Sequence, residues 1–310
     1  MKILFIRSGN SGIDPISTSQ GMSLHKLGVD VVFFDLTGRG IKGYLSNLPR
    51  IRQQARLEKP DLLHAHYSLS GIVAALACTG IPCGVSLMGS DVNASGAVSR
   101  TLLRLFALFS WKFVIVKSEE MYRKLGIRKA AILPNGVDRE LFYPMDTGLA
   151  RARLHWDPAK KHILFASDPE RPEKNYALAR AALDIMEKEA QPFDIHFLQG
   201  IPFEDVVYHY NAADVLLLTS LHEGSPNVIK EAMACNCPIV TTNVGDVAEV
   251  SAGTAQTCVT GFSAPQIAAA LKTMLASTAR SDGGRRIDRY DSRKIAERLA
   301  EIYRKTLQHG

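Results

Sequence analysis

Short apolar runs recur along the chain, each bounded by polar or small residues. The clearest, Val215–Leu218, is apolar at every position, which is typical of a strand buried on both faces of a parallel sheet. Runs of this kind predict strands at residues 3–6, 31–34, 61–66, 83–87, 113–116, 130–133, 163–166, 194–198 and 239–242. Segments with helical periodicity separate most of them, so the pattern predicts an α/β fold with parallel sheets.

The alternation of strands and helices pauses in the middle of the chain. A sharp turn at residues 134–138 leads into a connection that contains proline and charged residues, and the strand pattern resumes at residue 163. We therefore predict two domains, residues 1–145 and 146–288. Beyond a linker at 277–286, residues 292–307 are predicted to form a final amphipathic helix.

A helix start follows the strand at Val215–Leu218. In the loop at 222–227, Ser225 is a good N-cap, Pro226 suits the first helical position, and Asn227 leads into a helix predicted at 228–234. The carboxyl ends of parallel strands are where open α/β sheets bind ligands. Because a helix N-terminus attracts anions, this loop predicts a phosphate site.

Two carboxylates frame the helix start. Glu223 lies in the loop and Glu231 lies within the helix, with seven residues between them. Acidic side chains do not bind phosphate, but they suit the hydroxyl groups of a ribose or a hexose. The combination suggests a nucleotide-sugar site. The alternative is that Glu223 is a solvated loop residue and that Glu231 only favours the first turns of its helix.

Basic side chains follow other predicted strands. Arg171 and Lys174 lie in the loop at 167–175, where they could neutralise a diphosphate or simply be solvated. His64 and His66 alternate on the strand at 61–66 and therefore share one face of the sheet. His66 lies at the carboxyl end, where ligands bind, whereas His64 is predicted to be a core or supporting residue.

The charge is distributed unevenly along the chain. Residues 1–143 hold 18 Lys and Arg against 10 Asp and Glu, a net charge of +8, and the remainder carries −2. In the basic half, residues 43–58 predict a basic amphipathic helix, and residues 97–111 predict a helix that is largely core by composition. The asymmetry favours an anionic partner, either a membrane surface or a phosphorylated acceptor. Charge that serves only solubility is the alternative.

Composition disfavours several classes of protein. Hydrophobic residues make up 46% and charged residues 22%, as in ordinary globular proteins. No apolar stretch reaches the roughly 18 residues that span a bilayer, and the first residues predict a strand rather than a signal peptide, so we expect a cytoplasmic protein. The five cysteines fit reduced thiols, and no metal site is predicted. We expect no nucleic-acid partner.

Taken together, the motifs resemble the retaining glycosyltransferases of family 4, whose fold is called GT-B. The most specific mark is the pair Glu223 and Glu231 within HEGSPNVIKEAMACNCPIVTTNVGD. DLLHAHYSLSG, MGSD, ILPNGVDRELFYP and the Arg171/Lys174 loop also match, over nearly the whole chain. The resemblance implies two Rossmann-like domains that face each other across a cleft, with the nucleotide sugar bound by the second. It also implies that residues 289–310 form a helix that packs back on the first domain.

The resemblance also implies roles for the matching residues. Glu231 would hold the ribose hydroxyls, Glu223 would contact the donor sugar, and Arg171 and Lys174 would stabilise the leaving diphosphate. Backbone amides near Gly12 and at the helix start would add to this site. The helix-start residues are Ser225, Pro226 and Asn227. His66 would be a catalytic residue near the sugar on the acceptor side, and Ser90 and Asp91 would be acceptor-side residues.

The implied activity is transfer of a sugar from a UDP- or GDP-sugar to a glycan, lipid-linked or small-molecule acceptor, with retention of configuration. Polysaccharide, glycolipid or lipopolysaccharide assembly is the expected setting, and no metal or other cofactor is expected. Met88 stands where the family often has histidine, and residues 251–263 look short for the family. A nucleotide-sugar epimerase or hydrolase of the same architecture, or a non-catalytic sugar-binding member, remain as alternatives.

Overall fold

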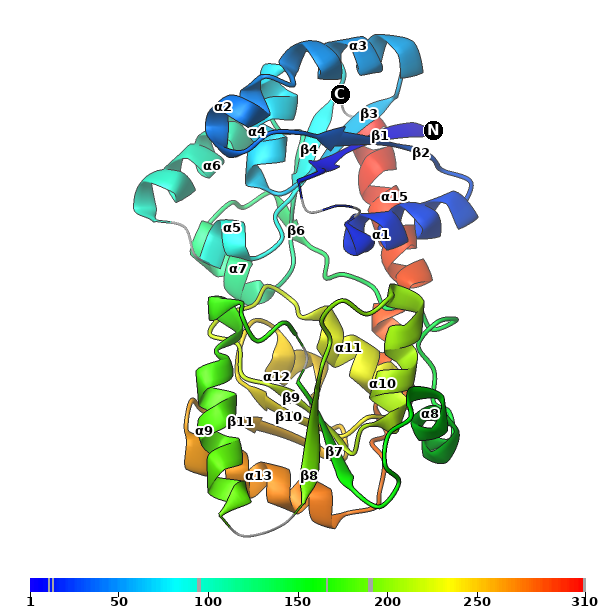
Figure 1. Ribbon diagram of the computed structural model, residues 1–310. Coiled ribbons are helices and arrows are strands. Elements are labelled where there is room, and N and C mark those ends of the chain that lie inside the picture. Colours follow the sequence, from blue (N-terminus) through cyan, green and yellow to red (C-terminus); the bar gives the residue numbers. More distant parts are fainter. Residues whose placement is uncertain (11, 13, 94–95, 166, 189–191, 309–310) are drawn as a thin grey trace. The chain divides into compact units, whose positions relative to one another are not determined.

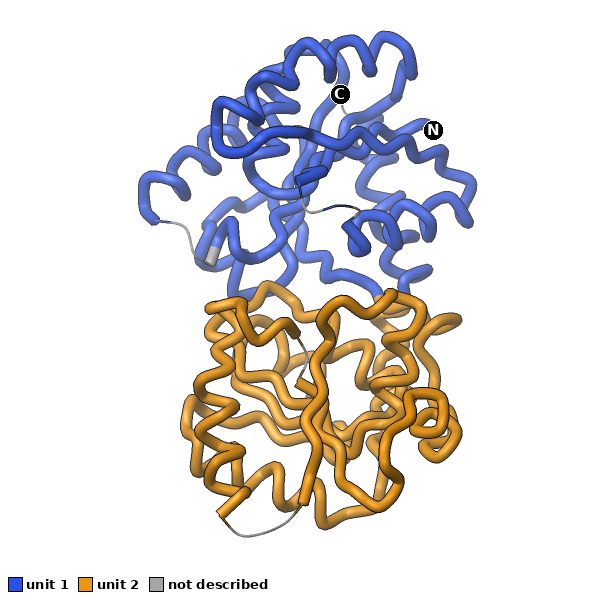
Figure 2. The backbone as a smooth tube through the Cα atoms, viewed as in Figure 1, with its two compact units in different colours: residues 1–136, 292–310 blue, residues 137–291 orange. Residues whose placement is uncertain are grey.

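The computed structural model describes residues 1–10, 12, 14–93, 96–165, 167–188 and 192–308. The chain divides into two compact units, which are residues 1–136 with 292–310 and residues 137–291 (Figure 2). Each unit is built on one parallel sheet, as the alternating pattern predicts.

Unit 1 contains a six-stranded sheet in the order β2-β1-β3-β4-β5-β6 (Figure 1). Its strands are β1 Lys2–Ser8, β2 Asp30–Leu36, β3 Leu62–His66, β4 Cys83–Ser86, β5 Phe113–Val116 and β6 Ala130–Ile132. Its helices are α1 Pro15–Lys26, α2 Gly40–Leu45, α3 Leu48–Glu58, α4 Ser68–Leu76, α5 Ser90–Asn93, α6 Ala97–Phe109, α7 Glu119–Leu125 and α15 Ser292–Gln308.

Different helices cover the two faces of this sheet. Successive side chains of a strand point to opposite faces, so Phe5 packs with α1 and α15 while Ile6 packs in a core that includes residues of α3, α4, α6 and α7. The last helix is therefore part of unit 1. Its Tyr303 is fully buried, and the Tyr303 hydroxyl lies 2.5 Å from Nδ1 of His64 on β3.

Unit 2 contains a five-stranded sheet in the order β11-β10-β9-β7-β8. Its strands are β7 Lys161–Phe165, β8 Phe193–Phe197, β9 Val215–Leu218, β10 Ile239–Thr242 and β11 Thr257–Thr260. Its helices are α8 Thr147–Leu154, α9 Tyr176–Glu187, α10 Val206–Ala212, α11 Asn227–Ala234, α12 Val247–Val250, α13 Ala264–Ala276 and α14 Gly283–Arg286. Short 3-10 turns occupy η1 Pro172–Lys174, η2 Phe203–Asp205 and η3 Ile287–Tyr290.

Two cores lie on opposite faces of this sheet. Leu164, Leu216 and Leu218 pack with α10 and α11, whereas Val215 and Leu217 pack with α9 and α13. The strand β9 is thus buried on both faces, as its continuous apolar run predicts. The predicted last residue of the strand at 163–166, Ala166, lies outside the described residues.

The division between the units falls earlier than the predicted boundary at residue 145. Val137 and Phe142 are buried in the core of unit 2, and the backbone N–H of Met145 donates to Oδ1 of Asn211 at 2.9 Å. The segment after the turn at 134–138 therefore belongs to the second unit. The return point, residue 291, lies three residues beyond the predicted 288.

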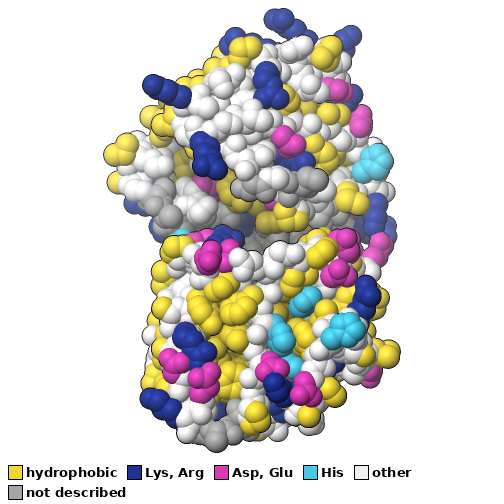
Figure 3. Space-filling view, viewed as in Figure 1, with side chains coloured by type: hydrophobic (Ala, Val, Ile, Leu, Met, Phe, Trp, Pro, Cys, Tyr) yellow, Lys and Arg dark blue, Asp and Glu magenta, His cyan; other side chains and the backbone are white. Residues whose placement is uncertain are grey.

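Two predicted helices of the basic half differ from the structure. The helix expected at 43–58 is two helices, α2 and α3, because Pro49 suits the first turn of a helix but not its interior. The helix expected to be largely core, α6, buries only Leu103 and Ala107. Hydrophobic side chains remain on the outer edge of unit 1 where α6 lies, at the left of Figure 3.

Candidate active site

Lys174 and Glu223 meet at the carboxyl edge of the sheet of unit 2. Lys174 ends η1, in the loop that follows β7, and Glu223 follows β9. The ammonium of Lys174 donates to Oε1 of Glu223 at 2.6 Å, and the Ser220 hydroxyl donates to the same oxygen at 2.8 Å. The two charged side chains are only 12% and 17% exposed. Burial makes this pair stronger than a surface ion pair.

The two loops that carry this pair are tied together by backbone contacts. The Thr219 hydroxyl donates to the carbonyl oxygens of Lys174 at 3.0 Å and Asn175 at 3.1 Å. The backbone N–H of Leu221 donates to the carbonyl of Glu173 at 2.9 Å. The ion pair is therefore held by its supporting loops rather than by two flexible side chains alone.

Arg171, the second cation predicted for the diphosphate, lies apart from this pair. Its guanidinium pairs with Glu173, two residues along the same loop, and its side chain is 55% exposed. The structure thus brings together Lys174 and Glu223 but gives Arg171 a different partner. A role for Arg171 toward a ligand stays a prediction.

The helix start at α11 differs from its prediction by one position. Pro226 is the N-cap and Asn227 begins the helix, so Ser225 is not the cap. The Ser225 hydroxyl instead donates to Oδ2 of Asp246 at 2.5 Å and lies 2.5 Å from the Lys230 ammonium. The Ser225 hydroxyl therefore bonds to two charged side chains, Asp246 and Lys230, instead of capping the helix.

Lys230 and Asp246 form a buried ionic group around Ser225 that the sequence analysis did not identify. Lys230 is fully buried, and burial lowers its pKa against the attraction of Asp246. Burial likewise raises the pKa of Asp246, opposed by Lys230. The signal in the sequence was two adjacent charges, Lys230 and Glu231, inside an otherwise apolar helix.

Close backbone packing brings the loop after β10 against the loop after β9. Gly245 has a φ of +58°, and a Cβ built on it would lie 2.8 Å from the carbonyl oxygen of Gly224. Only glycine combines this conformation with this approach. This close packing of the two loops places Asp246 beside Ser225.

Glu231 is buried on α11 beneath this group. The Tyr210 hydroxyl, from α10, donates to Oε2 of Glu231 at 2.7 Å. Burial raises the pKa of the Glu231 carboxyl, opposed by the Tyr210 hydrogen bond and by Lys230. Among the described residues, the Tyr210 hydroxyl is the one hydrogen-bond partner of the Glu231 carboxylate.

His66 occupies the carboxyl end of β3 in unit 1. Its ring lies 4.5 Å from that of His64, which is bonded to Tyr303 and to the Ser86 hydroxyl, so His64 is a supporting core residue as predicted. Neither ring nitrogen of His66 finds a hydrogen-bond partner among the described residues. Burial, together with the positive charges of Lys117 and Arg7, lowers the pKa of His66 to about 3. The imidazole is therefore neutral at ordinary pH.

Ser90 and Asp91 begin the short helix α5 in unit 1. Oδ1 of Asp91 accepts from the backbone N–H groups of Met88 and Gly89, each at 3.0 Å, and Oδ2 accepts from Ser68 at 3.0 Å. Asp91 thus links the loop after β4 to the start of α4. Contact of Ser90 or Asp91 with an acceptor stays a prediction.

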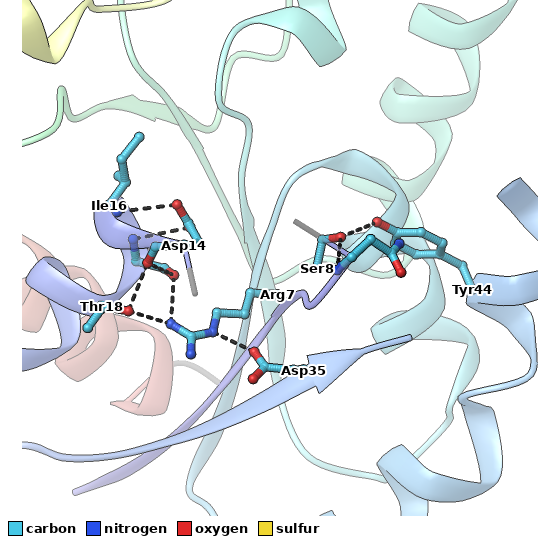
Figure 4. Close-up of polar contacts among 9 residues, drawn as sticks. Arg7, Ser8, Asp14, Ile16, Thr18, Asp35 and Tyr44 are labelled. Carbon is cyan, nitrogen blue, oxygen red and sulfur yellow. Dashed lines mark hydrogen bonds and ion pairs between the residues drawn. The ribbon is translucent and has the colours of Figure 1, made fainter. Parts of the chain in front are cut away.

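The end of β1 is held by a polar network around Arg7 (Figure 4). Its Nε donates to Asp35 at 2.6 Å, and its Nη1 donates to the Thr18 hydroxyl at 2.6 Å. Asp14 caps α1 by accepting from the backbone N–H groups of Ile16 and Ser17, each at 3.2 Å. Arg7 was not singled out in the sequence, and it fixes the start of α1 relative to the sheet.

Gly12 lies in the loop between β1 and α1. It is exposed, with a φ of +81°, and nothing would contact an added Cβ within 4 Å. Its neighbours Ser11 and Ile13 lie outside the described residues. A contact between this loop and a diphosphate stays a prediction.

Metal ligands and membrane spans were searched over the same residues. The described part of the chain has no cluster of three or more His, Cys, Asp or Glu side chains that could hold a metal ion. Within that part, no helix is long and apolar enough to cross a bilayer.

Comparisons with known proteins match both units. A family model described as Glycosyltransferase Family 4 matches residues 17–141, and one described as Glycosyl transferases group 1 matches residues 153–277. The first lies mainly in unit 1 and the second within unit 2. Together they account for most of the chain.

Two curated relatives illustrate the similarity in sequence. TuaC of Bacillus subtilis, assigned by name to teichuronic acid biosynthesis, is 28% identical over 214 residues, which cover 62% of this chain and 55% of TuaC. UDP-Gal:alpha-D-GlcNAc-diphosphoundecaprenol alpha-1,3-galactosyltransferase of Escherichia coli is 23% identical over 242 residues, covering 64% and 62%. The chain thus spans little more than half the length of these relatives.

Solved structures share the fold at lower identity. HepE of Anabaena, in complex with UDP and glucose, is 18% identical and covers 98% of this chain and 100% of its own, with a TM-score of 0.77. UDP-GlcNAc 2-epimerase of Methanocaldococcus jannaschii is 14% identical, with 98% and 100% covered and a TM-score of 0.61. The predicted GT-B fold is confirmed. Since family models match both halves, the chain belongs to the group 1, family 4 glycosyltransferases.

Proposed function

We propose that this chain transfers a sugar from a nucleotide-sugar donor to a hydroxyl group of an acceptor, with retention of configuration at the sugar. The observation that carries the proposal is the buried pair Lys174 and Glu223 at the carboxyl edge of the sheet of unit 2. Open α/β sheets bind ligands at this edge. HepE, which shares the fold, was solved with UDP and glucose, so a UDP-sugar is the first donor to test.

The donor site divides between nucleotide and sugar. The second oxygen of Glu231 suits a ribose hydroxyl, because a buried carboxylate is a strong acceptor. The start of α11 and the ammonium of Lys174 offer positive charge to the diphosphate. Glu223, whose carboxylate is already oriented by Lys174 and Ser220, contacts the hydroxyls of the sugar.

The reaction breaks the bond between the anomeric carbon and the diphosphate oxygen. Lys174 stabilises the charge that develops on this leaving group. The acceptor oxygen attacks from the side on which the diphosphate leaves, which retains the configuration, and its proton passes to a diphosphate oxygen. In this proposal Glu223 orients the sugar rather than acting as a nucleophile, and its Oε1 is held by an ammonium and a hydroxyl. We propose that neither the bond breaking nor the attack needs a metal ion, since Lys174 and the start of α11 offer positive charge to the diphosphate.

The acceptor is a glycan or a lipid-linked sugar bound by unit 1. A relative of the chain is named for a galactosyl transfer to a diphosphoundecaprenol-linked sugar, which supports an acceptor of this class. Polysaccharide or lipopolysaccharide assembly is the corresponding setting. His66, neutral and unpartnered among the described residues, is the side chain of unit 1 that we propose for orienting an acceptor hydroxyl.

Epimerisation of a nucleotide sugar is the second candidate, because a nucleotide-sugar 2-epimerase shares the fold. The fold alone does not separate the two activities.

A panel of UDP- and GDP-sugars, tested by thermal shift, first identifies the donor, since a bound donor raises the unfolding temperature. The identified donor is then incubated with the chain, with and without candidate acceptors. Transfer predicts a glycoside with the donor's anomeric configuration by NMR, whereas an epimer formed from donor alone would replace this proposal.

A further inference from the structure

The outward side of α6 carries a stripe of hydrophobic side chains that the described residues leave exposed. Val98, Leu102, Leu105 and Phe109 recur at spacings of four, three and four residues, so they share one side of the helix. Val98 is 85% and Phe109 77% exposed. Leu108, next to the stripe, is 69% exposed.

Packing within unit 1 does not need this stripe. Leu103 and Ala107 are the buried residues of α6, and they lie on the opposite side of the helix. Scattered single hydrophobic residues on a surface are ordinary, but a periodic row on one helix marks an interaction surface. The stripe therefore requires a partner.

Basic residues are frequent in α6 and in the segment that follows it. Residues 97–130 hold eight Lys and Arg against two Asp and Glu, a net charge of +6, and one of the eight, Lys117, is buried. Nε of Arg104 donates to the carbonyl of Leu125 at 2.7 Å, which brings the basic end of α7 beside α6. Just beyond the carboxyl end of α6, the ammonium of Lys129 donates to the carbonyl of Trp111 at 2.6 Å, next to Lys112 in the sequence.

A hollow of about 410 Å³ adjoins the carboxyl end of the stripe. Phe109 and Lys112 line it together with the loop at 78–82. It therefore presents an aromatic ring and an ammonium side by side at the surface, a combination that fits the boundary between acyl chains and headgroups.

This combination points to one kind of partner. A hydrophobic stripe with basic flanks is the pattern of a helix that lies in the plane of an anionic membrane surface. A second copy of this chain fits less well, because pairing the same surface would bring two strongly positive rims together. We propose that α6 docks unit 1 on anionic lipid, with Leu105 and Phe109 in the acyl boundary and the basic residues at the headgroups. This proposal does not depend on the transferase activity.

Sedimentation with vesicles of phosphatidylcholine, with and without phosphatidylglycerol, tests the docking. We expect binding only to the anionic vesicles, and weaker binding at high salt. The double variant Leu105→Asp/Phe109→Asp should lower the partition coefficient by roughly 100-fold, since two large apolar side chains leave the bilayer boundary. Phe262→Asp is the matched control, because Phe262 is also exposed but lies in unit 2, and it should bind like the wild type.

A variant that keeps the surface apolar gives a second readout. Phe109→Trp should show a blue shift of its emission with anionic vesicles, against the constant signal of the buried Trp111. The proposal is overturned by equal binding to neutral vesicles, by equal loss in Phe262→Asp, or by unchanged emission of Phe109→Trp. It is also overturned if the wild type is a dimer without lipid and the double aspartate variant is a monomer.

Discussion

The Lys174 ammonium lies 2.6 Å from a carboxylate oxygen of Glu223, and both side chains are mostly buried. They come from loops that follow two neighbouring strands, β7 and β9, of one parallel sheet. The attraction between the two side chains offsets part of the cost of burying them. The pair therefore holds a cation and a carboxylate in fixed positions at the edge of the sheet where we propose that the donor binds.

The loop after β7 carries two cations, Lys174 and Arg171. Comparing their variants distinguishes a direct role in the reaction from a general effect of positive charge. Lys174→Ala should lower the rate of nucleoside diphosphate release by roughly 100- to 1,000-fold, because the leaving group loses its stabilising charge. Arg171→Ala, with an exposed guanidinium that already pairs with Glu173, should cost less than about tenfold. The rate is measured on the identified donor, and similar losses in the two variants would show that both cations act on the diphosphate.

The buried carboxyl of Glu231 predicts how the free energy of unfolding changes with pH. Burial raises the pKa of its carboxyl in the folded chain, so folding favours the protonated form and this contribution is lost as pH rises through the folded pKa. Glu231→Gln keeps an oxygen for the Tyr210 hydroxyl but carries no charge. Urea denaturation should therefore show the variant gaining free energy of unfolding relative to the wild type as pH rises above the ordinary carboxyl pKa of 4.5. If the difference in unfolding free energy between the variant and the wild type does not change with pH, the ionised Glu231 carboxyl is not destabilised by burial.

Lys230 and Asp246 should behave as one buried ionic unit. Lys230→Met should cost roughly 3–5 kcal/mol of unfolding free energy, because it leaves the Asp246 carboxylate buried beside Ser225 without its cation. The double variant Lys230→Met/Asp246→Asn should recover most of this loss. Denaturant unfolding of both single variants and the double completes the cycle, and losses that simply add would show that the two side chains are not coupled.

His66 should make the chain sensitive to acid. Its folded pKa of about 3 lies below the ordinary value of 6.5, so the unfolded chain takes up the proton first and stability falls as pH drops through this window. Between about pH 7 and about pH 5 this one residue should remove roughly 2 kcal/mol. His66→Phe should lose correspondingly less over the same range in urea denaturation. Parallel losses in the two proteins would place the acid sensitivity elsewhere.

The sheets were the most predictable part of the structure. β5, β9 and β10 match their predicted bounds. β5 and β9 are continuous apolar runs, which are typical of strands buried on both faces of a sheet. β11 was missed, since Thr257–Thr260 is a short edge strand with mixed polarity. The exposed stripe of α6 was assigned to the core because composition counts hydrophobic residues without saying which side of a helix is covered.

Two candidate residues could be placed at one edge of the sheet because each follows a strand. They are Lys174 and Glu223, and the structure joins them directly. The partners of Ser225 could not be placed in this way, because Asp246 reaches it from 21 residues away only through the close packing of Gly245 on Gly224. Pairings of this kind depend on tertiary contacts that no local pattern contains.

Calorimetric titration of UDP-glucose into the wild type and two acid variants tests the central claim most directly. The wild type should bind the donor, Glu231→Ala should lose measurable binding because the ribose loses its acceptor, and Glu187→Ala, at an exposed acid of α9, should bind like the wild type. If UDP-glucose does not bind, the same titration is repeated with the other UDP- and GDP-sugars. Binding that survives in Glu231→Ala, or no binding of any nucleotide sugar to the wild type, would contradict the claim.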